Sequence, residues 1–332
     1  MVAHSDQQLS AAPVPPVDRS SATRTFVDVE QAVAAVVATE PSTIRLAVSC
    51  VAAHGHLLVE DHPGLGKTTL AKALAGALGL GFHRLQCTAD LLPADVVGAT
   101  VLGPDGTEPV FRPGPVFTNI LMADELNRAS PRAQSALLEA MEEHQVSVDG
   151  TTHALPDPFF VLATQNPFDA TGTSPLPHGQ RDRFLVRLTL GYPGRPQMDA
   201  MLAGPDPADT VRHITPSISA ADLALLMAAV REVHVAPAVR AYVLDLVEAT
   251  RAHPQIAVGA SPRAAQALVG VAAAQAVASD RSYTTPDDVQ EAAVPTLAHR
   301  LLLRPGVEVT GDEGEALVAE LTASVPVPLL TD

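Results

Sequence analysis

The stretch from residue 61 to residue 69 has the residue types and the spacing of a loop that binds phosphate. A short apolar run precedes Gly64 and Gly66, and a helix-forming run follows Lys67 and Thr68. This strand–loop–helix order is the context that such a loop requires. Two glycines let backbone N–H groups approach phosphate oxygens, and the start of a helix attracts the same anion. The sequence therefore predicts that Lys67 binds the β- and γ-phosphates of a nucleotide and that the Thr68 hydroxyl binds Mg²⁺.

The residues predicted to bind the nucleotide form one contiguous set: Asp61, His62, Pro63, Gly64, Leu65, Gly66, Lys67, Thr68 and Thr69. The full pattern has glycine where this chain has Asp61, so the match is incomplete at that position. Lys67 and Lys72 are the only lysines in the sequence. A compact ammonium fits between two phosphate groups where a planar guanidinium does not, so this usage supports the prediction.

Polar residues follow two apolar runs that are typical of buried parallel strands. One run ends in Asp124 and Glu125, and another leads to Asn166. Ligands of open α/β sheets bind at the carboxyl ends of the strands. Asp124 is therefore predicted to hold Mg²⁺ through water, Glu125 to deprotonate the attacking water, and Asn166 to hydrogen-bond the γ-phosphate or that water. Two alternatives stay open: acids after a strand also cap helices, and Asn before Pro167 also ends a strand in a turn.

Two arginines are candidates for stabilising phosphate charge from outside the loop. Arg183 follows a long Gly/Pro/Thr-rich segment, where it could reach a neighbouring subunit's nucleotide as an arginine finger. A surface ion pair with Asp182 is the alternative. Ser261 and Pro262 have the types of an N-cap and a first helical residue, so Arg263 is predicted at a helix start where it could meet phosphate.

Composition excludes several classes of protein. The net charge of −16 argues against a protein that coats nucleic acid. Cys50 and Cys87 lack metal-site spacing, and free buried thiols are expected. The sequence has neither an apolar run long enough to span a bilayer nor a secretory N-terminus, so a cytoplasmic location is expected.

The pattern along the 332 residues divides into three parts. Residues 1–22 are predicted to be a disordered leader, 23–194 a nucleotide-binding α/β domain, and 195–332 a helical domain. Helices are expected at 196–203, 219–232, 237–252, 261–278, 286–302 and 313–323. Turn signals at Asp105-Gly106 and Asp149-Gly150 predict two hairpins within the α/β domain.

One further helix is expected over residues 131–144 of the α/β domain. Its apolar residues fall on one side, and Glu142 and Glu143 near its end are expected to be solvated charges. The hairpin near residue 105 is predicted to be a protrusion that touches a client, although an inert insertion would give the same pattern.

Taken together, these motifs resemble those of the MoxR family of AAA+ ATPases. The matching pieces run in order over residues 26–303 and are Glu60-Asp61-His62-Pro63-Gly64-Leu65-Gly66-Lys67-Thr68, Asp90-Leu91-Leu92-Pro93, Phe111-Arg112-Pro113-Gly114-Pro115, Ala123-Asp124-Glu125-Leu126-Asn127-Arg128-Ala129, Ala163-Thr164-Gln165-Asn166-Pro167, Asp182-Arg183-Phe184 and Gly259-Ala260-Ser261-Pro262-Arg263. Collectively they are far more specific than the phosphate loop alone.

The resemblance implies an α/β fold of the P-loop NTPase class. Its AAA+ core would be a parallel sheet of order 5-1-4-3-2 with helices on both faces, followed by an all-helical lid domain. ATP and Mg²⁺ would bind between subunits of a homo-oligomeric ring, expected to be a hexamer. The family positions make Asp124 and Glu125 the second nucleotide motif, Asn166 sensor 1, Arg183 the arginine finger and Arg263 sensor 2.

The resemblance also implies partners and a cellular role. Family members work with a partner that carries a von Willebrand A domain, and they mature client protein complexes or insert metal into enzymes. The two hairpins would be the helix-2 and pre-sensor-1 insertions. The chain departs from the family pattern at His178-Gly179 and at Arg181, so Arg181 and Arg183 compete for the finger role.

An ATP-driven remodelling chaperone is the function that these expectations favour. A nucleic-acid-dependent motor, a nucleotide-gated scaffold that hardly hydrolyses ATP, and a magnesium-chelatase-like motor subunit are the alternatives. The acidic balance counts against nucleic acid.

Overall fold

A computed structural model describes residues 18–103, 108–166, 174–204, 207–304 and 313–328. Its centre is a sheet of five parallel strands in the order β2-β5-β8-β1-β9. The strands are β1 (Leu57–Glu60), β2 (Phe82–Gln86), β5 (Ile120–Asp124), β8 (Phe160–Gln165) and β9 (Val186–Leu188). Numbered within the sheet, this is the order 5-1-4-3-2, and the prediction from the family resemblance is confirmed.

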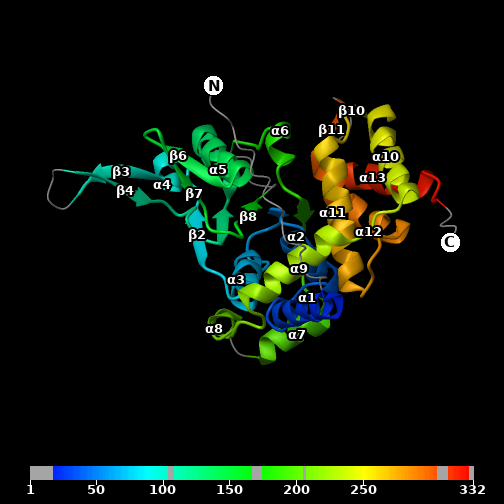
Figure 1. Ribbon diagram of the computed structural model, residues 1–332, viewed down its shortest axis with the longest axis horizontal. Coiled ribbons are helices and arrows are strands. Elements are labelled where there is room, and N and C mark those ends of the chain that lie inside the picture. The colour runs from blue at the N-terminus through cyan, green and yellow to red at the C-terminus, as the bar shows by residue number, and fades with distance from the viewer. Residues whose placement is uncertain (1–17, 104–107, 167–173, 205–206, 305–312, 329–332) are drawn as a thin grey trace, which may run out of the picture.

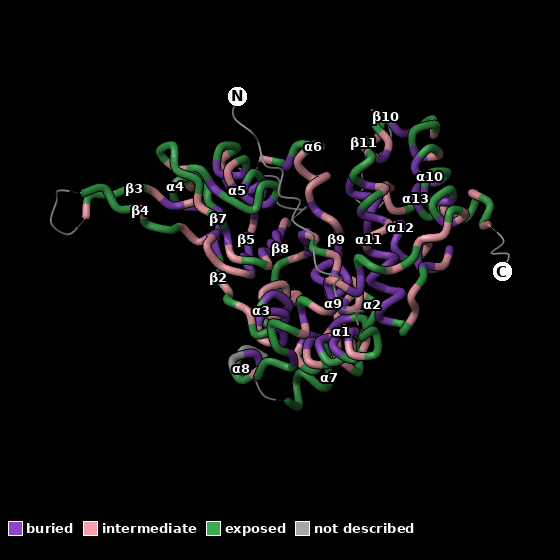
Figure 2. The backbone as a smooth tube through the Cα atoms, viewed as in Figure 1, coloured by how far each residue is buried: buried purple, intermediate pink, exposed green. Residues whose placement is uncertain are grey.

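The central strands of the sheet, β5 and β8, are largely apolar runs that are covered on both faces. All of β5 and the first five residues of β8 are buried, as expected where helices cover a parallel sheet on each side. In β1, Leu57 and Val59 pack into one apolar cluster and Leu58 into another. This alternation follows from the two-residue period of a strand, and Figure 2 shows the buried strands at the centre of the chain.

Helices from both parts of the chain build the first cluster. Those of the α/β domain are α1 (Arg19–Ala34), α2 (Pro41–Ala52) and α3 (Lys67–Leu78), and helices of the second part, given below, complete the cluster. Helix α1 begins at Arg19, inside the range predicted as a leader; residues 1–17 lie outside the described residues. The Asp18 side chain accepts a hydrogen bond from the Ser21 amide, which is an N-cap that starts the helix four residues earlier than the predicted domain boundary.

The second cluster lies under α5 (Pro131–Glu143), which contributes Leu137, Leu138 and Met141. The adjoining short elements are α4 (Pro93–Val97), η1 (Leu126–Arg128) and α6 (His178–Arg181). Ser130 is the N-cap of α5, and His144, which has a left-handed backbone, is its C-cap. The predicted helix over 131–144 is present.

Both predicted hairpins are present as antiparallel pairs. They are β3 (Gly98–Leu102) with β4 (Pro109–Pro113), and β6 (Gln145–Val148) with β7 (Thr151–Ala154). The turn at Asp105-Gly106 lies outside the described residues, whereas Asp149 and Gly150 both have positive φ, as a tight hairpin turn needs. Figure 1 shows β3 and β4 projecting from the sheet.

The remaining elements form the helical lid. They are α7 (Arg195–Ala203), α8 (Pro207–Arg212), α9 (Ala220–Glu232), α10 (Pro237–Ala252), α11 (Pro262–Ala278), α12 (Pro286–Leu297), η2 (Ala298–Arg300) and α13 (Glu313–Ser324), with a short antiparallel pair β10 (Ile256–Val258) and β11 (Leu302–Leu303). The predicted helix over 286–302 ends at Leu297, because His299 and Arg300 turn inward to bind the Phe184 carbonyl. No helix among the described residues is both long and apolar enough to cross a membrane.

Candidate nucleotide-binding site

The phosphate loop has the backbone that its glycines predict. It leaves β1 after Glu60 and enters α3 at Lys67, and Gly64 and Gly66 have φ of +86° and +88°. A Cβ at either position would meet nothing within 4 Å. Glycine is therefore needed there for the left-handed backbone rather than for space.

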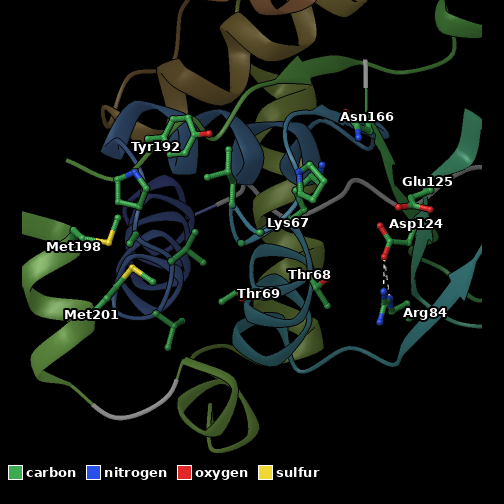
Figure 3. Close-up of a pocket in the computed structure, with 18 residues that line it drawn as sticks. Lys67, Thr68, Thr69, Arg84, Asp124, Glu125, Asn166, Tyr192, Met198 and Met201 are labelled. Carbon is green, nitrogen blue, oxygen red and sulfur yellow. Dashed lines mark hydrogen bonds and ion pairs between the residues drawn. The ribbon is translucent and has the colours of Figure 1, made fainter. Parts of the chain in front are cut away.

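A cavity of about 760 Å³ opens beside this loop and brings together most of the predicted site residues. Its volume lies in the range typical of small-molecule sites. The residues predicted for the site that line this cavity are Pro63, Gly64, Leu65, Gly66, Lys67, Thr68, Thr69, Asp124, Glu125 and Asn166. Figure 3 shows the acidic pair on one side of the loop residues and an apolar group on the other.

The Lys67 side chain is held by the backbone at the start of the loop. Its Nζ donates a hydrogen bond to the carbonyl of Asp61. Partial burial lowers the pKa of Lys67, and the carboxylates of Asp61, Asp124 and Glu125 oppose that shift. The ammonium therefore sits close to the acidic pair at the start of a helix, where a phosphate would complete its surroundings.

The buried Asp124 carboxylate is fixed through both of its oxygens. Thr164 donates its hydroxyl to Oδ1 at 2.6 Å, and Arg84 Nη2 donates to Oδ2 at 2.6 Å. The Thr68 hydroxyl and the Asp124 carboxylate are hard oxygen donors of the kind that Mg²⁺ prefers. These two residues fit the predicted magnesium site, with Arg84 as a competing partner of Asp124.

Glu125 stands apart from the helix that follows it. It has a left-handed backbone at φ 56°, and its side chain does not cap η1 in this described segment. Its carboxylate accepts a hydrogen bond from Gln86 Nε2 at 3.3 Å and forms an ion pair with Arg128 Nε at 3.1 Å. Glu125 therefore does not cap the helix that follows the strand, which was the alternative to a catalytic role. Its carboxylate lines the cavity instead.

Arg84 and Gln86 are residues that the sequence reading missed. They lie two apart on β2, beside β5, so both side chains point to the same face of the sheet. Their alternation with Leu85, together with a neighbouring strand that ends in two acids, is the signal that could have found them. Both bind the acidic pair, and Arg84 also lines the cavity.

The far end of the cavity is apolar and was also missed. It is lined by Val36, Val37, Ala38, Tyr192, Pro193, Met198 and Met201. Tyr192 is 75% exposed, and the two methionines are about 40% exposed. Flat, polarisable side chains around an open space suit a heteroaromatic ring.

Asp61, where the loop pattern has glycine, anchors the loop. Its Oδ2 accepts hydrogen bonds from the amides of Leu190 and Gly191, both at 2.8 Å, and its Oδ1 accepts one from His62 N. Of the described loop residues, those from Pro63 to Thr69 line the cavity, whereas Asp61 and His62 do not. The carboxylate instead ties the loop to the chain that follows β9.

Replacing Asp61 with Ala is expected to lower the free energy of unfolding by about 2–4 kcal/mol. The buried Leu190 amide and the part-buried Gly191 amide would lose their acceptor, and a buried donor left without one costs about 1–3 kcal/mol. Urea unfolding followed by circular dichroism measures the change. Asp28→Ala, at an exposed position of α1, is the matched control and should stay within about 0.5 kcal/mol of the parent. An Asp61→Ala midpoint equal to that of the control would contradict the anchoring role.

The two predicted arginines meet at a second cavity, of about 300 Å³. Arg183 and Arg263, both described, line this cavity and not the first. Each forms an ion pair with Glu142, which is exposed as expected but is paired with these two arginines. Asp182 pairs with Arg300 at 3.2 Å rather than with Arg183, and Ser261 is the N-cap of α11 as predicted.

Arg181 and His178 lie in different surroundings from Arg183. Arg181 is half-buried, and burial lowers its pKa while Glu60 opposes the shift. His178 Nε2 lies 2.6 Å from the backbone carbonyl of Arg300. His178 therefore makes a contact within its own subunit, and Arg181 is half-buried there.

His56, which lies just before β1, is buried and bonded within the fold. Burial lowers the pKa of His56 to about 4, and its ring nitrogens bind the Met141 carbonyl and the Val161 amide. Within the described part of the chain no cluster of three or more potential ligands is found. Cys50 and Cys87 are free and buried, as the sequence predicts.

Comparison with known proteins agrees with this fold and site. Residues 56–186 match the model of the ATPase family associated with various cellular activities (AAA), and residues 248–321 match the AAA lid domain. The crystal structure of a protein from Cytophaga hutchinsonii described as an ATPase superimposes with a TM-score of 0.84 at 32% identity, covering 94% of this chain and 97% of that one. The fold and the site define a nucleotide-binding protein of the AAA+ ATPase class.

Individual relatives narrow the class. The chain is 39% identical over 262 residues to Chaperone MoxR1 of Mycobacterium tuberculosis, covering 75% of this chain and 68% of the relative. It is 35% identical to Protein MoxR of Paracoccus denitrificans, covering 91% and 96%. It is 44% identical to the uncharacterized protein YeaC of Bacillus subtilis, covering 86% and 89%. The chain belongs to the MoxR family of AAA+ ATPases.

Proposed function

We propose that this protein binds and hydrolyses MgATP and uses that cycle to remodel client proteins within a homo-oligomeric ring. The observation that carries the proposal is the convergence of Lys67, Thr68, Asp124, Glu125 and Asn166 on one cavity. These residues come from the ends of two strands, β5 and β8, and from the start of α3. Such a set has the parts that phosphoryl transfer to water requires.

The phosphates would bind over the loop and the N-terminus of α3. Backbone amides around Gly64 and Gly66, the helix dipole and the Lys67 ammonium would neutralise their charge. Thr68 and Asp124 would hold Mg²⁺, which supplies further positive charge to the phosphate oxygens.

The apolar end of the cavity supports a nucleoside triphosphate with a purine base. Tyr192, Met198 and Met201 offer an aromatic face and two thioethers. The base would bury against them while the phosphates reach the loop. This arrangement accounts for exposed apolar side chains that would otherwise be costly in water.

Glu125 would act as the general base for the attacking water. Gln86 and Arg128 orient its carboxylate, and Asn166 lines the same cavity. Arg84 holds Asp124 in place from β2. Because little covalent chemistry is needed, catalysis would come from positioning and charge stabilisation.

Arg183 and Arg263 support an assembly in which sites are shared between subunits. They lie outside their own subunit's nucleotide cavity and are part-exposed, at 28% and 45% of the side-chain surface. A neighbouring subunit's nucleotide is the ligand that fits them, with Arg183 as the arginine finger and Arg263 as sensor 2. The half-buried Arg181 beside Glu60 is the weaker candidate. A closed ring, expected to be a hexamer, would repeat this contact at every interface.

The hairpins are the proposed client-contacting elements. Val101, Leu102 and Val110 on β3 and β4 are 38%, 70% and 48% exposed, which is unusual for apolar residues that lack a role. Phe111 of β4 stacks on His153 of β7 with ring centroids 3.9 Å apart, so the two hairpins touch. A partner with a von Willebrand A domain, metal insertion into client enzymes and a cytoplasmic location remain part of the proposal.

Purified protein is expected to release phosphate from ATP only when Mg²⁺ is present. Turnover per subunit should rise with protein concentration, since each site needs an arginine from a neighbour. A phosphate-release assay with and without EDTA, paired with light scattering, measures both effects. Tight ATP binding without phosphate release would instead identify a nucleotide-gated scaffold. Stimulation by DNA that weakens with salt would favour the motor alternative.

A further inference from the structure

Glu142, one residue before the end of α5, bridges two arginines that come from different domains. Arg183 Nε and Nη2 both lie 2.8 Å from Glu142 Oε2. Arg263, the second residue of α11 in the lid, donates from Nη2 to Glu142 Oε1. Each carboxylate oxygen of Glu142 therefore binds one guanidinium. Through this side chain, α5 links the two arginines that are proposed to act on the neighbouring subunit.

The bonds to Glu142 leave part of each guanidinium available. A guanidinium carries five N–H donors, and Nη1 of Arg183 and Nε and Nη1 of Arg263 take no part in these contacts. Two cations against one carboxylate leave a net positive charge. The arrangement can thus attract a phosphate without first breaking the bonds that hold it.

The backbone around Arg183 is fixed by a separate set of contacts. The buried Arg300 pairs with the Asp182 carboxylate at 3.2 Å and donates from Nη2 to the Phe184 carbonyl at 2.7 Å. Ser261 donates its hydroxyl to the same carboxylate at about 3.0 Å. Loss of Glu142 would therefore leave the Arg183 backbone in place and release only the direction of its side chain.

Without Glu142 the two guanidiniums would repel one another. Like charges at such close quarters favour separated rotamers, and long arginine side chains lose conformational freedom only when something holds them. Hydrogen bonding from Arg263 keeps the pKa of Glu142 below its ordinary value, so the carboxylate stays ionised at neutral pH.

We propose that Glu142 is a positioning residue that aligns Arg183 and Arg263 as a pair, so that both meet the same phosphate of the neighbouring subunit's nucleotide. The inference rests on the proposed function, because it assumes that Arg183 acts in trans. It adds a third residue to the donating side of each interface. With Glu142 in this role, the lid arginine Arg263 and the proposed finger Arg183 would approach the phosphate as one unit.

Glu142→Gln tests this with little change of shape. We expect kcat for ATP hydrolysis to fall about 10–100-fold, as is typical when a residue that orients a reacting group is lost. The dissociation constant for ATP should stay within about twofold, since Glu142 does not line the nucleotide cavity of its own described chain. Glu143→Gln, the adjacent exposed carboxylate, is the matched control and should keep the parent kcat. An unchanged kcat for Glu142→Gln, or an equal loss in both variants, would overturn the proposal.

Mixing variants separates positioning in trans from a general structural defect. A Glu142→Gln subunit has an intact pocket of its own and a defective donating side, whereas a Glu125→Gln subunit has the opposite fault. Mixed rings should therefore hydrolyse ATP faster than the two proteins measured separately. Mixing Glu142→Gln with Arg183→Ala should give no gain, because both fail on the donating side.

A parallel mixture of Arg183→Ala with Glu125→Gln distinguishes the positioning role of Glu142 from the action of Arg183 on the neighbouring subunit. If it recovers activity and the Glu142→Gln mixture does not, the role of Glu142 is wrong and the trans action of Arg183 stands. If neither recovers while both variants bind ATP and assemble, the shared site itself is wrong. Recovery in both mixtures supports the inference.

Discussion

Replacing Glu125 with Gln is expected to stop ATP turnover while ATP still binds. The amide keeps the size of the side chain and can still bond to Gln86, but it cannot take a proton from water. Loss of a general base costs about 10²–10⁴-fold in rate. Lys67, Thr68 and Asp124 are untouched, so the affinity for MgATP should change little.

Single-turnover phosphate release and equilibrium binding of ATP measure these two quantities for the Glu125 variant. Glu139→Gln removes a carboxylate from an exposed position of α5 and serves as the control, with rate and affinity both unchanged. If Glu125→Gln hydrolyses ATP at the parent rate, Glu125 is not the base. The slow variant would also hold its clients longest, which makes it the reagent of choice for isolating them from native cells.

Replacing Arg183 with Ala is expected to lower ATP turnover by about 10³–10⁵-fold, the range seen when an arginine finger is absent in comparable systems. Binding of ATP to isolated subunits should be unaffected, since Arg183 lines the second cavity. The part-exposed ion pair with Glu142 contributes little to folding, so the variant should remain stable.

Arg181→Ala is the informative comparison for the finger assignment. Arg181 is half-buried near Glu60, and its removal should affect stability more than trans catalysis. Steady-state turnover, ATP affinity and urea unfolding of both variants distinguish the two outcomes. A turnover loss confined to Arg181→Ala would transfer the finger role to that residue.

In the proposed ring, both variants would act on one chemical event from opposite sides of a subunit interface. Glu125 would belong to the subunit that binds the nucleotide, and Arg183 to the subunit that completes the pocket. The lid contacts at Asp182, through Arg300 and Ser261, connect the finger segment to α11. A change in lid position in one subunit would therefore reach the neighbour's active site.

The sequence by itself determined the nucleotide loop and the strands that carry the acidic pair. Local rules were enough for this: glycine at left-handed positions, apolar runs for buried strands, and N-caps such as Ser261. The sheet order followed from the family resemblance, because no local pattern encodes which strands pair. Most helices of the lid also began and ended near their predicted residues, because caps and periodicity act over a single helical turn.

Only the tertiary structure decided the partners of the charged groups. Arg84 binds Asp124, which lies 40 residues further along the sequence, and Arg263 binds Glu142, which lies 121 residues earlier. Asp61 looked like an imperfect phosphate contact and proved to be an anchor for the chain after β9. Such contacts depend on which strands and helices become neighbours, and sequence periodicity reports which face a residue takes but not what lies opposite it.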